Sequence, residues 1–489
     1  MSAADSRDEA DPVPLSAVIT RLRPQLVVGD ADGVLVRDVQ FDHRKVRPSN
    51  GAGDLFCCVP GELRDGHAFA DEALLAGAVA FVCERPLEGV ARRAPQLVVG
   101  AGQARTAMAE AACTVHHDPA AKLHTVGVTG TNGKTTTTFL LRSVLEAEGW
   151  PTMVIGTLGG VRTTPEAPDL QRQFASAVRA GKTAVALEVT SHALVQRRVD
   201  GYRHEVAVFT NLSQDHLDYH LTMERYFEAK ASLFTPEHAR AGVVNSDDPY
   251  GERLLKVAGI PLSGFGLADA TELEMDLDAS RFVFEGHRVH LHLTGEPNVR
   301  NALAAAAAAR ALGASAANVA AGLSAATGVP GRFEGVDNAL GVNVVVDYAH
   351  TPSALEQTLA AVRRLAGNGR LIVVFGAGGD RDREKRSLMG RAATTSADVV
   401  VLTSDNPRHE DALAIIGDVE RGCNGGAELL IEPDRRTAIA FALALALPGD
   451  VVVVAGKGHE TTQQIGDDLH EFDDRDVVRA EAARLAADR

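Results

Sequence analysis

The chain lacks any long apolar run. The longest runs, such as residues 451–455, are far shorter than the roughly 20 residues that a membrane-spanning helix needs. Residues 1–14 are acidic and polar, without the apolar stretch of a secretory signal, and this composition predicts a disordered leader. We therefore expect a cytoplasmic protein that does not insert into membranes.

The chain also lacks a metal-binding cysteine pattern and an excess of positive charge. The formal net charge is -16, whereas nucleic acid binding requires a basic surface, so nucleic acid is not expected as a partner. The cysteines are odd in number and show no metal-ligand spacing, and we interpret them as structural thiols. They are Cys57, Cys58, Cys83, Cys113 and Cys423.

The length of 489 residues exceeds one ordinary hydrophobic core and predicts about three domains. After about residue 120, β-branched runs alternate with helical Ala/Leu/Arg-rich segments, a pattern typical of an α/β fold with parallel sheets covered by helices. The β-branched runs are residues 125–129, 183–189, 206–210, 342–347, 371–375, 399–403 and 451–455.

Two changes of composition predict the domain boundaries. A polar stretch ends near residue 119, and an Ala-rich segment, residues 301–327, ends before the turn at 328–331. We interpret the Ala-rich segment as a packed helical pair, with a linker as the alternative. The predicted domains, after the leader, are residues 15–118, 119–335 and 336–489.

The strongest local motif is a Gly-rich loop between a β-run and a helical segment. In such a loop, backbone N–H groups cradle phosphates, Lys134 would reach the β- and γ-phosphate oxygens, and the Thr135 hydroxyl would ligate Mg2+. Val128 occupies the first Gly position of the strict G-x-x-x-x-G-K pattern. The predicted ATP-binding residues here are Gly127, Thr129, Gly130, Thr131, Asn132, Gly133, Lys134, Thr135 and Thr136.

Downstream polar residues follow two further β-runs. Glu188 ends one run, at the edge where open α/β sheets bind ligands, and together with the loop it is a candidate Mg2+ ligand beside Thr135. His216 follows the next run. From the residues alone, Glu188 could be an ordinary surface residue and His216 a solvated loop residue.

The loop Gly130-Thr-Asn-Gly-Lys-Thr135 resembles that of the Mur ligases and of the similar folylpolyglutamate synthetases. The resemblance covers about residues 42–476, and its motifs are jointly specific. It implies an ATP-dependent carbon–nitrogen ligase with a UDP-binding N-terminal domain, a central ATP-binding domain of the P-loop type and a Rossmann-like C-terminal domain that binds an amino acid. Further motifs begin at Thr163 (TTPEAPD), Glu188 (EVTSHAL), Asp347 (DYAHTP), Asp405 (DNPR) and Gly456 (GKGHE).

The resemblance also implies roles for individual residues. Lys134, Glu188, His216 and Lys230 would be catalytic, with a second Mg2+ on His216. Lys230 would be carbamylated to N6-carboxylysine, since a bare Lys would bring positive charge to a cation site. Further ATP contacts would be Asn298, Arg332 and Asp347. The UDP-MurNAc-dipeptide would bind Phe41, His43, Thr163, Thr164, Thr190, Gln196 and Arg198.

Two positions depart from the family pattern. His43 stands where the family usually has Ser, and Pro297 replaces the aromatic residue that commonly precedes the Asn. The first departure concerns the uridine contact and the second the nucleotide contact.

The amino-acid substrate is indicated by Asp405-Asn406-Pro407-Arg408. An Arg fork grips a carboxylate in two places, which suits the second carboxylate of diaminopimelate and not L-lysine. Standing alone, the tetrapeptide would be an ordinary surface turn. The resemblance adds Arg386, Gly456 and Glu460 as contacts.

The implied reaction adds meso-2,6-diaminopimelate to the γ-carboxylate of D-Glu in UDP-MurNAc-L-Ala-D-Glu through an acyl phosphate, in peptidoglycan synthesis. ATP and Mg2+ are the expected cofactors, a monomer is the expected state, and no protein nucleophile is expected. The alternatives are the same ligase acting on L-lysine, a folylpolyglutamate synthetase-like ligase, and a non-catalytic nucleotide-binding paralogue.

Overall fold

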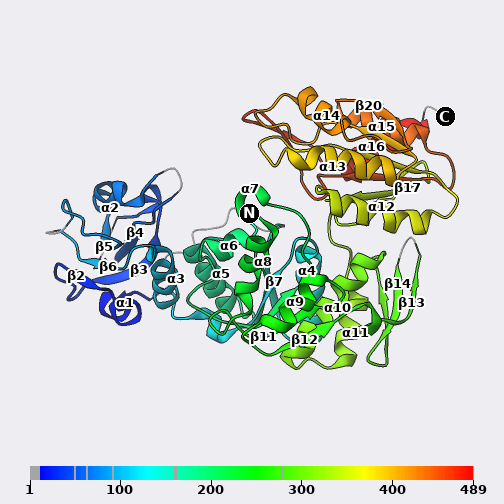
Figure 1. Ribbon diagram of the computed structural model, residues 1–489. Coiled ribbons are helices and arrows are strands. Elements are labelled where there is room, and N and C mark those ends of the chain that lie inside the picture. Colours follow the sequence, from blue (N-terminus) through cyan, green and yellow to red (C-terminus); the bar gives the residue numbers. More distant parts are fainter. Residues whose placement is uncertain are drawn as a thin grey trace.

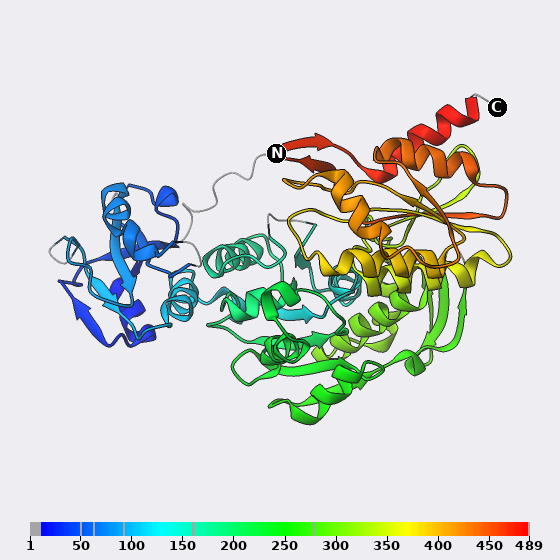
Figure 2. The same cartoon turned by 45° about the horizontal axis from the view of Figure 1, so that its top comes forward.

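Three α/β units follow one another along the chain in the computed structural model (Figure 1), which describes residues 11–48, 51–61, 64–90, 93–158, 162–276 and 279–487. Each unit has its own six-stranded sheet. The N-terminal unit lies to one side of the central unit, and the C-terminal unit packs against the central unit (Figures 1 and 2). The α/β fold class and the three-part architecture are therefore confirmed.

The N-terminal sheet has the order β1-β3-β4-β5-β6-β2, with parallel strands inside and antiparallel strands at both edges. The strands are β1 (Val13–Pro14), β2 (Leu26–Val28), β3 (Leu35–Gln40), β4 (Gly53–Cys57), β5 (Ala78–Cys83) and β6 (Gln96–Val98). The helices are α1 (Leu15–Leu22), α2 (Ala70–Ala76) and α3 (Ala104–Val115).

The leader is shorter than the sequence indicates. Val13 and Pro14 pair with Val36 and Leu35 of β3, so the predicted disorder of these two residues is wrong. Val13 is buried against the core of this unit, and burial of an apolar side chain in a paired strand offsets the entropy of ordering it. Residues 1–10 of the predicted leader lie outside the described residues.

The central sheet is parallel throughout, in the order β12-β11-β10-β7-β9-β8. Helices cover both faces, which explains why its strands are continuous apolar runs. One core cluster joins the sheet to α4, α10 and α11, and a second joins the other face to α5, α8 and α9. The strands are β7 (His124–Thr129), β8 (Thr152–Ile155), β9 (Ala184–Glu188), β10 (His204–Phe209), β11 (Ala239–Asn245) and β12 (Leu262–Phe265).

The helices of the central unit include the predicted Ala-rich pair, α10 and α11. This pair packs closely on α4, since a Cβ on Gly322 would lie 2.5 Å from the Cα of Val144. Helix α10 begins at Glu296, five residues before the predicted start. The helices are α4 (Lys134–Ala147), α5 (Ala167–Arg179), α6 (Ser191–Val195), α7 (Leu217–His220), α8 (Met223–Ala231), α9 (Pro249–Val257), α10 (Glu296–Leu312) and α11 (Ala316–Ala325).

A three-stranded antiparallel sheet between α9 and α10 was not predicted. Its strands are β13 (Thr271–Met275), β14 (Ser280–Phe284) and β15 (His287–Leu291). Phe282, Phe284, Val289 and Leu291 are buried and alternate with more exposed residues. This period of two is the signal of a half-buried strand, and it is present in the sequence.

The C-terminal sheet has the order β16-β17-β21-β18-β19-β20. Its central strand β21 is buried along its whole length. The strands are β16 (Glu334–Gly335), β17 (Asn343–Asp347), β18 (Leu371–Phe375), β19 (Val399–Leu402), β20 (Glu428–Ile431) and β21 (Val451–Ala455), with a hairpin of β22 (Thr462–Ile465) and β23 (Asp468–Glu471). The helices are α12 (Pro352–Ala366), α13 (Glu384–Ser396), α14 (Ala412–Glu420), α15 (Arg435–Leu445) and α16 (Asp474–Ala487).

Two expectations from composition can be compared with this fold. All five cysteines are free thiols, and Cys423 alone among them is partly exposed, in agreement with structural roles. Within the described ranges, no helix combines the length and the apolar character required to cross a bilayer.

Candidate active site

The Gly-rich loop joins the carboxyl end of β7 to the first residue of α4. Gly130 and Gly133 have φ angles of 153° and 87°, and a Cβ on Gly130 would lie 1.8 Å from the Thr210 hydroxyl oxygen. Only glycine fits both positions without strain. The loop therefore presents its backbone N–H groups at a helix N-terminus, the arrangement that binds phosphate.

Lys134 lies across this loop. Its Nζ donates hydrogen bonds of 2.8 Å to the carbonyl oxygens of Gly130 and of Thr131. Loss of solvent around the amine lowers the pKa of Lys134. The ammonium is thus held where the phosphates of a nucleotide on this loop would meet it.

The side chains of Glu188 and Thr135 are in contact at the phosphate loop. The Thr135 hydroxyl donates to Glu188 Oε2 at 3.0 Å, and Arg332 from the segment before β16 donates to the same hydroxyl oxygen at 3.2 Å. Glu188 is buried and also accepts from the backbone and side chain of Thr157 at 3.0 and 3.1 Å. The structure therefore brings three predicted site residues together, and it adds Thr157.

The donor set at this point fits Mg2+. Thr135 and Glu188 offer hard oxygen ligands at the phosphate loop, and Mg2+ is usually bound by one or two carboxylates plus phosphate oxygens and water. Among the described residues, no group of three or more His, Cys, Asp and Glu side chains is arranged to hold a metal by itself. The site thus suits a metal that arrives with a nucleotide.

Lys230 approaches the loop from α8. Its Nζ donates to the carbonyl oxygen of Gly130 at 2.8 Å and lies 4.8 Å from the centroid of the Tyr226 ring. The side chain is fully buried, and burial together with the charge of Lys134 lowers the pKa of Lys230 well below its usual value. A buried amine of this kind loses its proton more readily than an exposed lysine does.

His216 belongs to the segment between β10 and α7. It precedes α7 with a φ of 54°, its Nε2 is 3.4 Å from Asp215 Oδ2, and its ring packs edge-on to His192 and Tyr226. Burial lowers the pKa of His216 to about 4. The imidazole is therefore neutral near pH 7 and can act as a ligand.

A cavity of about 310 Å³ adjoins the phosphate loop. Asn132 and Gly133 line it, and so does Asn301, whose side-chain oxygen would lie 2.3 Å from a Cβ on Gly133. The predicted contact Asn298 instead turns inward and donates to the carbonyl oxygen of Thr294 at 2.9 Å. Asn301, one helical turn later, is the residue that faces this cavity.

Asp347 supports the loop that carries Arg332. Its carboxylate accepts from the backbone N–H of Phe333 at 2.7 Å and from the Thr358 hydroxyl at 3.0 Å. Burial raises the pKa of Asp347, although the nearby Arg332 charge opposes this. Asp347 thus fixes the junction between the central and C-terminal units.

The residues predicted to hold the dipeptide form one hydrogen-bonded cluster. The Thr164 hydroxyl donates to the carbonyl oxygen of Glu188 at 2.8 Å and accepts from the Thr190 backbone N–H at 3.0 Å. Arg198 donates to the carbonyl oxygen of Thr164 at 2.9 Å and to the Gln196 side chain at 2.6 Å. The Thr163 hydroxyl lies 3.1 Å from that of Thr157.

Phe41 and His43 are separate from this cluster. Both belong to the N-terminal unit, where the His43 ring stacks on Phe69 with 4.7 Å between centroids. The N-terminal unit is tied to the central unit by Arg172, whose Nη1 is 2.7 Å from Asp38 Oδ1. The predicted uridine contacts thus lie in the N-terminal unit, and the Arg172–Asp38 ion pair joins this unit to the central unit.

A second cavity, of about 200 Å³, lies between the central and C-terminal units. Asp215 and His216 line it from the central unit, and most of its other walls come from loops that follow strands of the C-terminal sheet. The further lining residues include Tyr348, His350, Arg381, Lys385, Asp405, Asn406, Arg408, Gly456 and Glu460.

Two arginines face this second cavity from adjacent loops. Arg408 Nη1 donates to the carbonyl oxygen of Gly379 at 2.6 Å, and Arg381 Nη1 donates to the carbonyl oxygen of Asp380 at 3.4 Å. Over the described part of the chain, neither guanidinium forms a salt bridge. Both forks therefore keep donors for a carboxylate ligand.

Arg386 does not face the cavity, contrary to the prediction. Its side chain is 1% exposed and donates to both oxygens of Glu410, to Asp418 and to the carbonyl oxygen of Gly378. Its position on the inner face of α13 explains this burial. Arg381, five residues earlier, lines the cavity in its place, and the sequence reasoning missed it.

The remaining predicted contacts surround a buried lysine. Lys457 Nζ donates to the side-chain oxygens of Asn406 and Glu460, at 3.1 Å each, and to the carbonyl oxygen of Thr462 at 2.6 Å. Asn406 in turn donates to Glu460 at 2.8 Å. Asp405 Oδ1 lies 3.8 Å from Lys457 Nζ and is buried without a hydrogen-bond partner among the described residues. Burial raises the pKa of its carboxyl group.

Gly456 lines the same cavity, whereas the predicted contact Pro407 is not among its lining residues and packs against the loop that follows β18. The carbonyl oxygen of Pro407 would lie 1.9 Å from a Cβ on Gly379, so the two loops touch without room for a side chain. Gly456 has a φ of 115° and donates to the carbonyl oxygen of Asp347.

Comparisons with known proteins agree with this geometry. Residues 128–309 match the model of the Mur ligase middle domain, and residues 331–458 match the Mur ligase, glutamate ligase domain. Together these matches cover more than half of the chain.

Relatives with curated names extend the match over nearly the whole chain. A UDP-N-acetylmuramoyl-L-alanyl-D-glutamate--2,6-diaminopimelate ligase from Geobacillus thermodenitrificans is 44% identical, over 90% of this chain and 94% of its own. A ligase of the same name from Streptomyces coelicolor is 43% identical, over 96% of this chain and 97% of its own.

Solved structures give the same result for the fold. The structure of a UDP-N-acetylmuramoyl-L-alanyl-D-glutamate--2,6-diaminopimelate ligase is similar with a TM-score of 0.64 and 35% identity, covering 92% of this chain and 95% of its own. The MurF ligase from Thermotoga maritima, in complex with ADP, has a TM-score of 0.61 and 20% identity, covering 92% of this chain and 97% of its own, and it supports the fold alone.

Proposed function

The chain belongs to the Mur ligase family, and we propose that it attaches meso-2,6-diaminopimelate to the γ-carboxylate of D-Glu in UDP-MurNAc-L-Ala-D-Glu at the expense of ATP. The single observation that supports this amino acid best is the pair Arg381 and Arg408 at one cavity. Two guanidiniums that form no salt bridge with any described residue suit a substrate with two carboxylates, and L-lysine has only one.

The phosphate loop would hold ATP, and phosphoryl transfer needs positioning and charge neutralisation more than a covalent protein group. The loop N–H groups and Lys134 would bind the phosphates. Thr135 and Glu188 would hold Mg2+, which when bound neutralises phosphate charge. The γ-phosphoryl group would pass to the D-Glu carboxylate and give an acyl phosphate.

Attack by the amine requires that the amino-acid cavity open toward the phosphate loop. Arg408, Asn406 and Glu460 line a further cavity of about 820 Å³ together with Thr157, a hydrogen-bond partner of Glu188. The two sites are thus joined by one open space between the central and C-terminal units. An amine held near Arg408 would reach an acyl phosphate formed near Glu188, and ADP and phosphate would leave.

We propose that Lys230 becomes carbamylated. Its lowered pKa supports the reaction, because a neutral amine, and not an ammonium, attacks CO2. The product is an anion, which would fit beside Mg2+ on His216 better than a cation would.

Each of the three units would bind a different substrate. Residues 15–118 would bind the uridine nucleotide, with Phe41 and His43 beside it. Residues 119–335 would bind ATP and the dipeptide, and residues 336–489 would bind diaminopimelate. We propose that the enzyme acts as a monomer in the cytoplasm, without nucleic acid partners.

Omission of single substrates tests this proposal. Phosphate release should require ATP, Mg2+, UDP-MurNAc-L-Ala-D-Glu and diaminopimelate together, and omission of any one should reduce the rate to background. Phosphate release that does not depend on the UDP-linked substrate would contradict the proposal. Absence of release with the full set would favour a non-catalytic protein.

A further inference from the structure

Two loops at the carboxyl edge of the C-terminal sheet lie against each other. Residues 376–383 follow β18, residues 403–411 follow β19, and these strands are parallel neighbours. The Gly379 N–H donates to the carbonyl oxygen of Asn406 at 2.9 Å, and Arg408 Nη1 donates to the carbonyl oxygen of Gly379 at 2.6 Å. The first loop carries Arg381 and the second carries Arg408, so their contact sets the spacing of the two guanidiniums.

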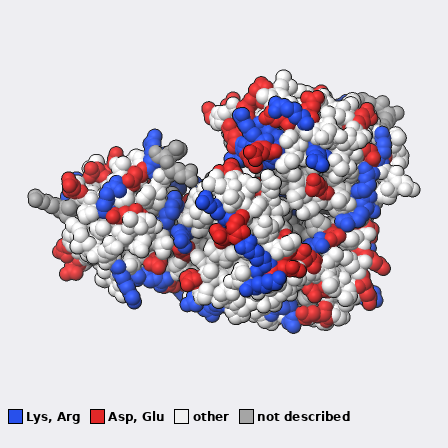
Figure 3. Space-filling view, in the orientation of Figure 1, with Lys and Arg blue, Asp and Glu red and all other residues white. Residues whose placement is uncertain are grey.

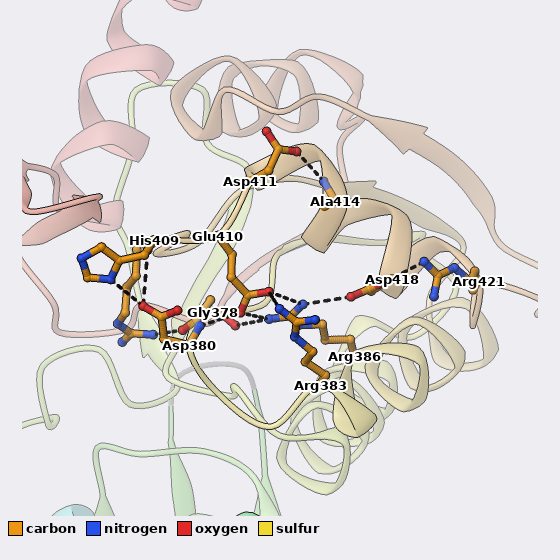
Figure 4. A network of polar contacts seen from close by, with 12 residues as sticks. Gly378, Asp380, Arg383, Arg386, His409, Glu410, Asp411, Ala414, Asp418 and Arg421 are labelled. Carbon is orange, nitrogen blue, oxygen red and sulfur yellow. Dashed lines mark hydrogen bonds and ion pairs between the residues drawn. The ribbon is translucent and has the colours of Figure 1, made fainter. Parts of the chain in front are cut away.

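Glu410 joins the two loops with its carboxylate. Oε1 accepts from the Asp380 backbone N–H at 2.7 Å and from Arg386 Nη2 at 2.7 Å. Oε2 accepts from Arg383 Nη2 at 2.8 Å and from Arg386 Nη1 at 3.1 Å. Figure 4 shows Glu410 reaching from the second loop toward Arg386 on α13, beside Gly378 and Asp380 of the first loop.

Arg386 on α13 contacts both loops and also α14. Its Nη2 also donates to the carbonyl oxygen of Gly378 at 3.3 Å, and its Nη1 donates to Asp418 of α14 at 2.9 Å. The same guanidinium therefore contacts the first loop, the carboxylate of the second loop and a neighbouring helix. A planar fork with fixed donor directions is suited to hold three such partners at a set geometry.

Neither Arg386 nor Glu410 is among the residues that line the second cavity. A buried guanidinium is costly unless it is fully paired, and a structural purpose alone would be met by apolar packing between α13 and α14. The ion pair instead connects the two loops that carry the cavity arginines. Its geometry thus points to a role in the amino-acid site.

We propose that Arg386 and Glu410 are positioning residues for the amino-acid substrate. The pair holds Arg381 and Arg408 at the separation that a substrate with two carboxylates requires, and so sets the preference for such a substrate over one with a single carboxylate. This inference rests on the proposed function.

The test compares Glu410→Gln with Asp418→Asn in steady-state phosphate release. The first variant removes the charge that joins the loops. The second removes a carboxylate partner of Arg386 on α14 that is bonded to neither loop. For E410Q we expect the KM for diaminopimelate to rise at least tenfold, with kcat and the KM for ATP changed less than threefold. The ratio of kcat/KM for diaminopimelate to that for L-lysine should fall by a similar factor, and D418N should resemble wild type.

Arg386→Lys provides a second variant for the case in which E410Q does not fold. It keeps the positive charge but cannot join Glu410 to the carbonyl oxygen of Gly378 as the guanidinium fork does, so it should raise the same KM when measured well below its thermal midpoint. If E410Q and R386K both had a lower thermal midpoint but an unchanged KM for diaminopimelate, the positioning role of Arg386 and Glu410 would be overturned. Wild-type enzyme without activity on diaminopimelate would overturn both the proposed function and the positioning role. Active wild-type enzyme with an unchanged KM in both variants would overturn the positioning role alone.

Discussion

The Thr135 hydroxyl donates a 3.0 Å hydrogen bond to Glu188 Oε2, which joins the phosphate loop to the end of the neighbouring strand β9. Arg332 donates to the same hydroxyl oxygen from the junction with the C-terminal unit. Three segments far apart in the sequence thus converge at the point proposed for Mg2+.

Glu188→Gln should reduce kcat by about 10²- to 10³-fold, because it removes the charge on a metal ligand that acts on the transferring phosphoryl group. The amide keeps the shape of the side chain, so the protein should stay folded. The measurement is kcat as a function of Mg2+ concentration. Thr157→Ser is the matched control, since it keeps both hydrogen bonds to Glu188 and should remain within a few-fold of wild type.

If Lys230 is carbamylated, the activity of the enzyme should depend on CO2. Removal of CO2 and bicarbonate from the buffer should reduce activity, and added bicarbonate should restore it, because the buried amine would lose and regain its carboxylate. Lys230→Met should be inactive with or without bicarbonate. Wild-type activity that is the same in CO2-free buffer, with an unmodified Lys230 by mass spectrometry, would contradict the proposed carbamylation.

Arg408→Leu should raise the KM for diaminopimelate by roughly 10- to 100-fold, since a hydrogen bond to a charged group contributes about 1.5–3 kcal/mol. The KM for ATP should not change. Arg421→Gln is the control, because Arg421 is an exposed partner of Asp418 and does not line the cavity. An equal rise of KM in both variants would argue against a specific contact.

Asp38 anchors the N-terminal unit. Its side chain is 1% exposed. Burial alone would raise its pKa, but the contact with His116, whose Nε2 is 3.3 Å from Asp38 Oδ1, and the charge of Arg172 hold the pKa below the usual value. Asp38→Asn would leave Arg172 without this buried partner, and we expect a loss of about 3 kcal/mol in unfolding free energy. Urea denaturation measures this loss, and the exposed control Glu224→Gln should change the unfolding free energy far less.

Burial of His204 should make the unfolding free energy of the protein fall at acid pH. It is buried beneath Gly127, and burial lowers its pKa from 6.5 to about 3. Above pH 6.5, both the folded and the unfolded chain hold this imidazole neutral. As the pH falls from 6.5 toward 3, only the unfolded chain gains the proton, so stability is progressively lost.

Between pH 7.5 and 5.5, wild type should therefore lose about 1 kcal/mol more unfolding free energy than His204→Phe, which cannot titrate. Urea denaturation of both proteins at the two pH values gives this difference, and other histidines cancel in the comparison. Equal losses for the two proteins would show that His204 is not kept neutral by the fold.

The strands of the central and C-terminal sheets could be predicted because burial on both faces of a sheet requires apolar side chains at every position. Strands buried on both faces, such as β7, β18 and β21, are continuous apolar runs, and their predicted bounds agree with the structure within about two residues. The phosphate loop could be predicted for a similar reason, since its glycines and Lys134 have geometric requirements that few sequences meet.

The orientation of single residues on a helix could not be predicted from a motif. Arg381 and Arg386 are five positions apart, and the sequence does not show that α13 begins at Glu384 and turns Arg386 inward. Asn298 and Asn301 are three positions apart on α10, and only packing shows which one faces the cavity. At both places tertiary contacts, and not the local pattern, decide which of two similar side chains faces the cavity.

The most direct test of the account is a competition between two amino acids. Enzyme, ATP, Mg2+ and UDP-MurNAc-L-Ala-D-Glu are incubated with equal concentrations of meso-diaminopimelate and L-lysine, and the product is identified by mass spectrometry. We expect the diaminopimelate adduct almost alone, since Arg381 and Arg408 would each bind one carboxylate and L-lysine has only one. A product that carries mainly lysine would contradict the proposed substrate and the role of both arginines.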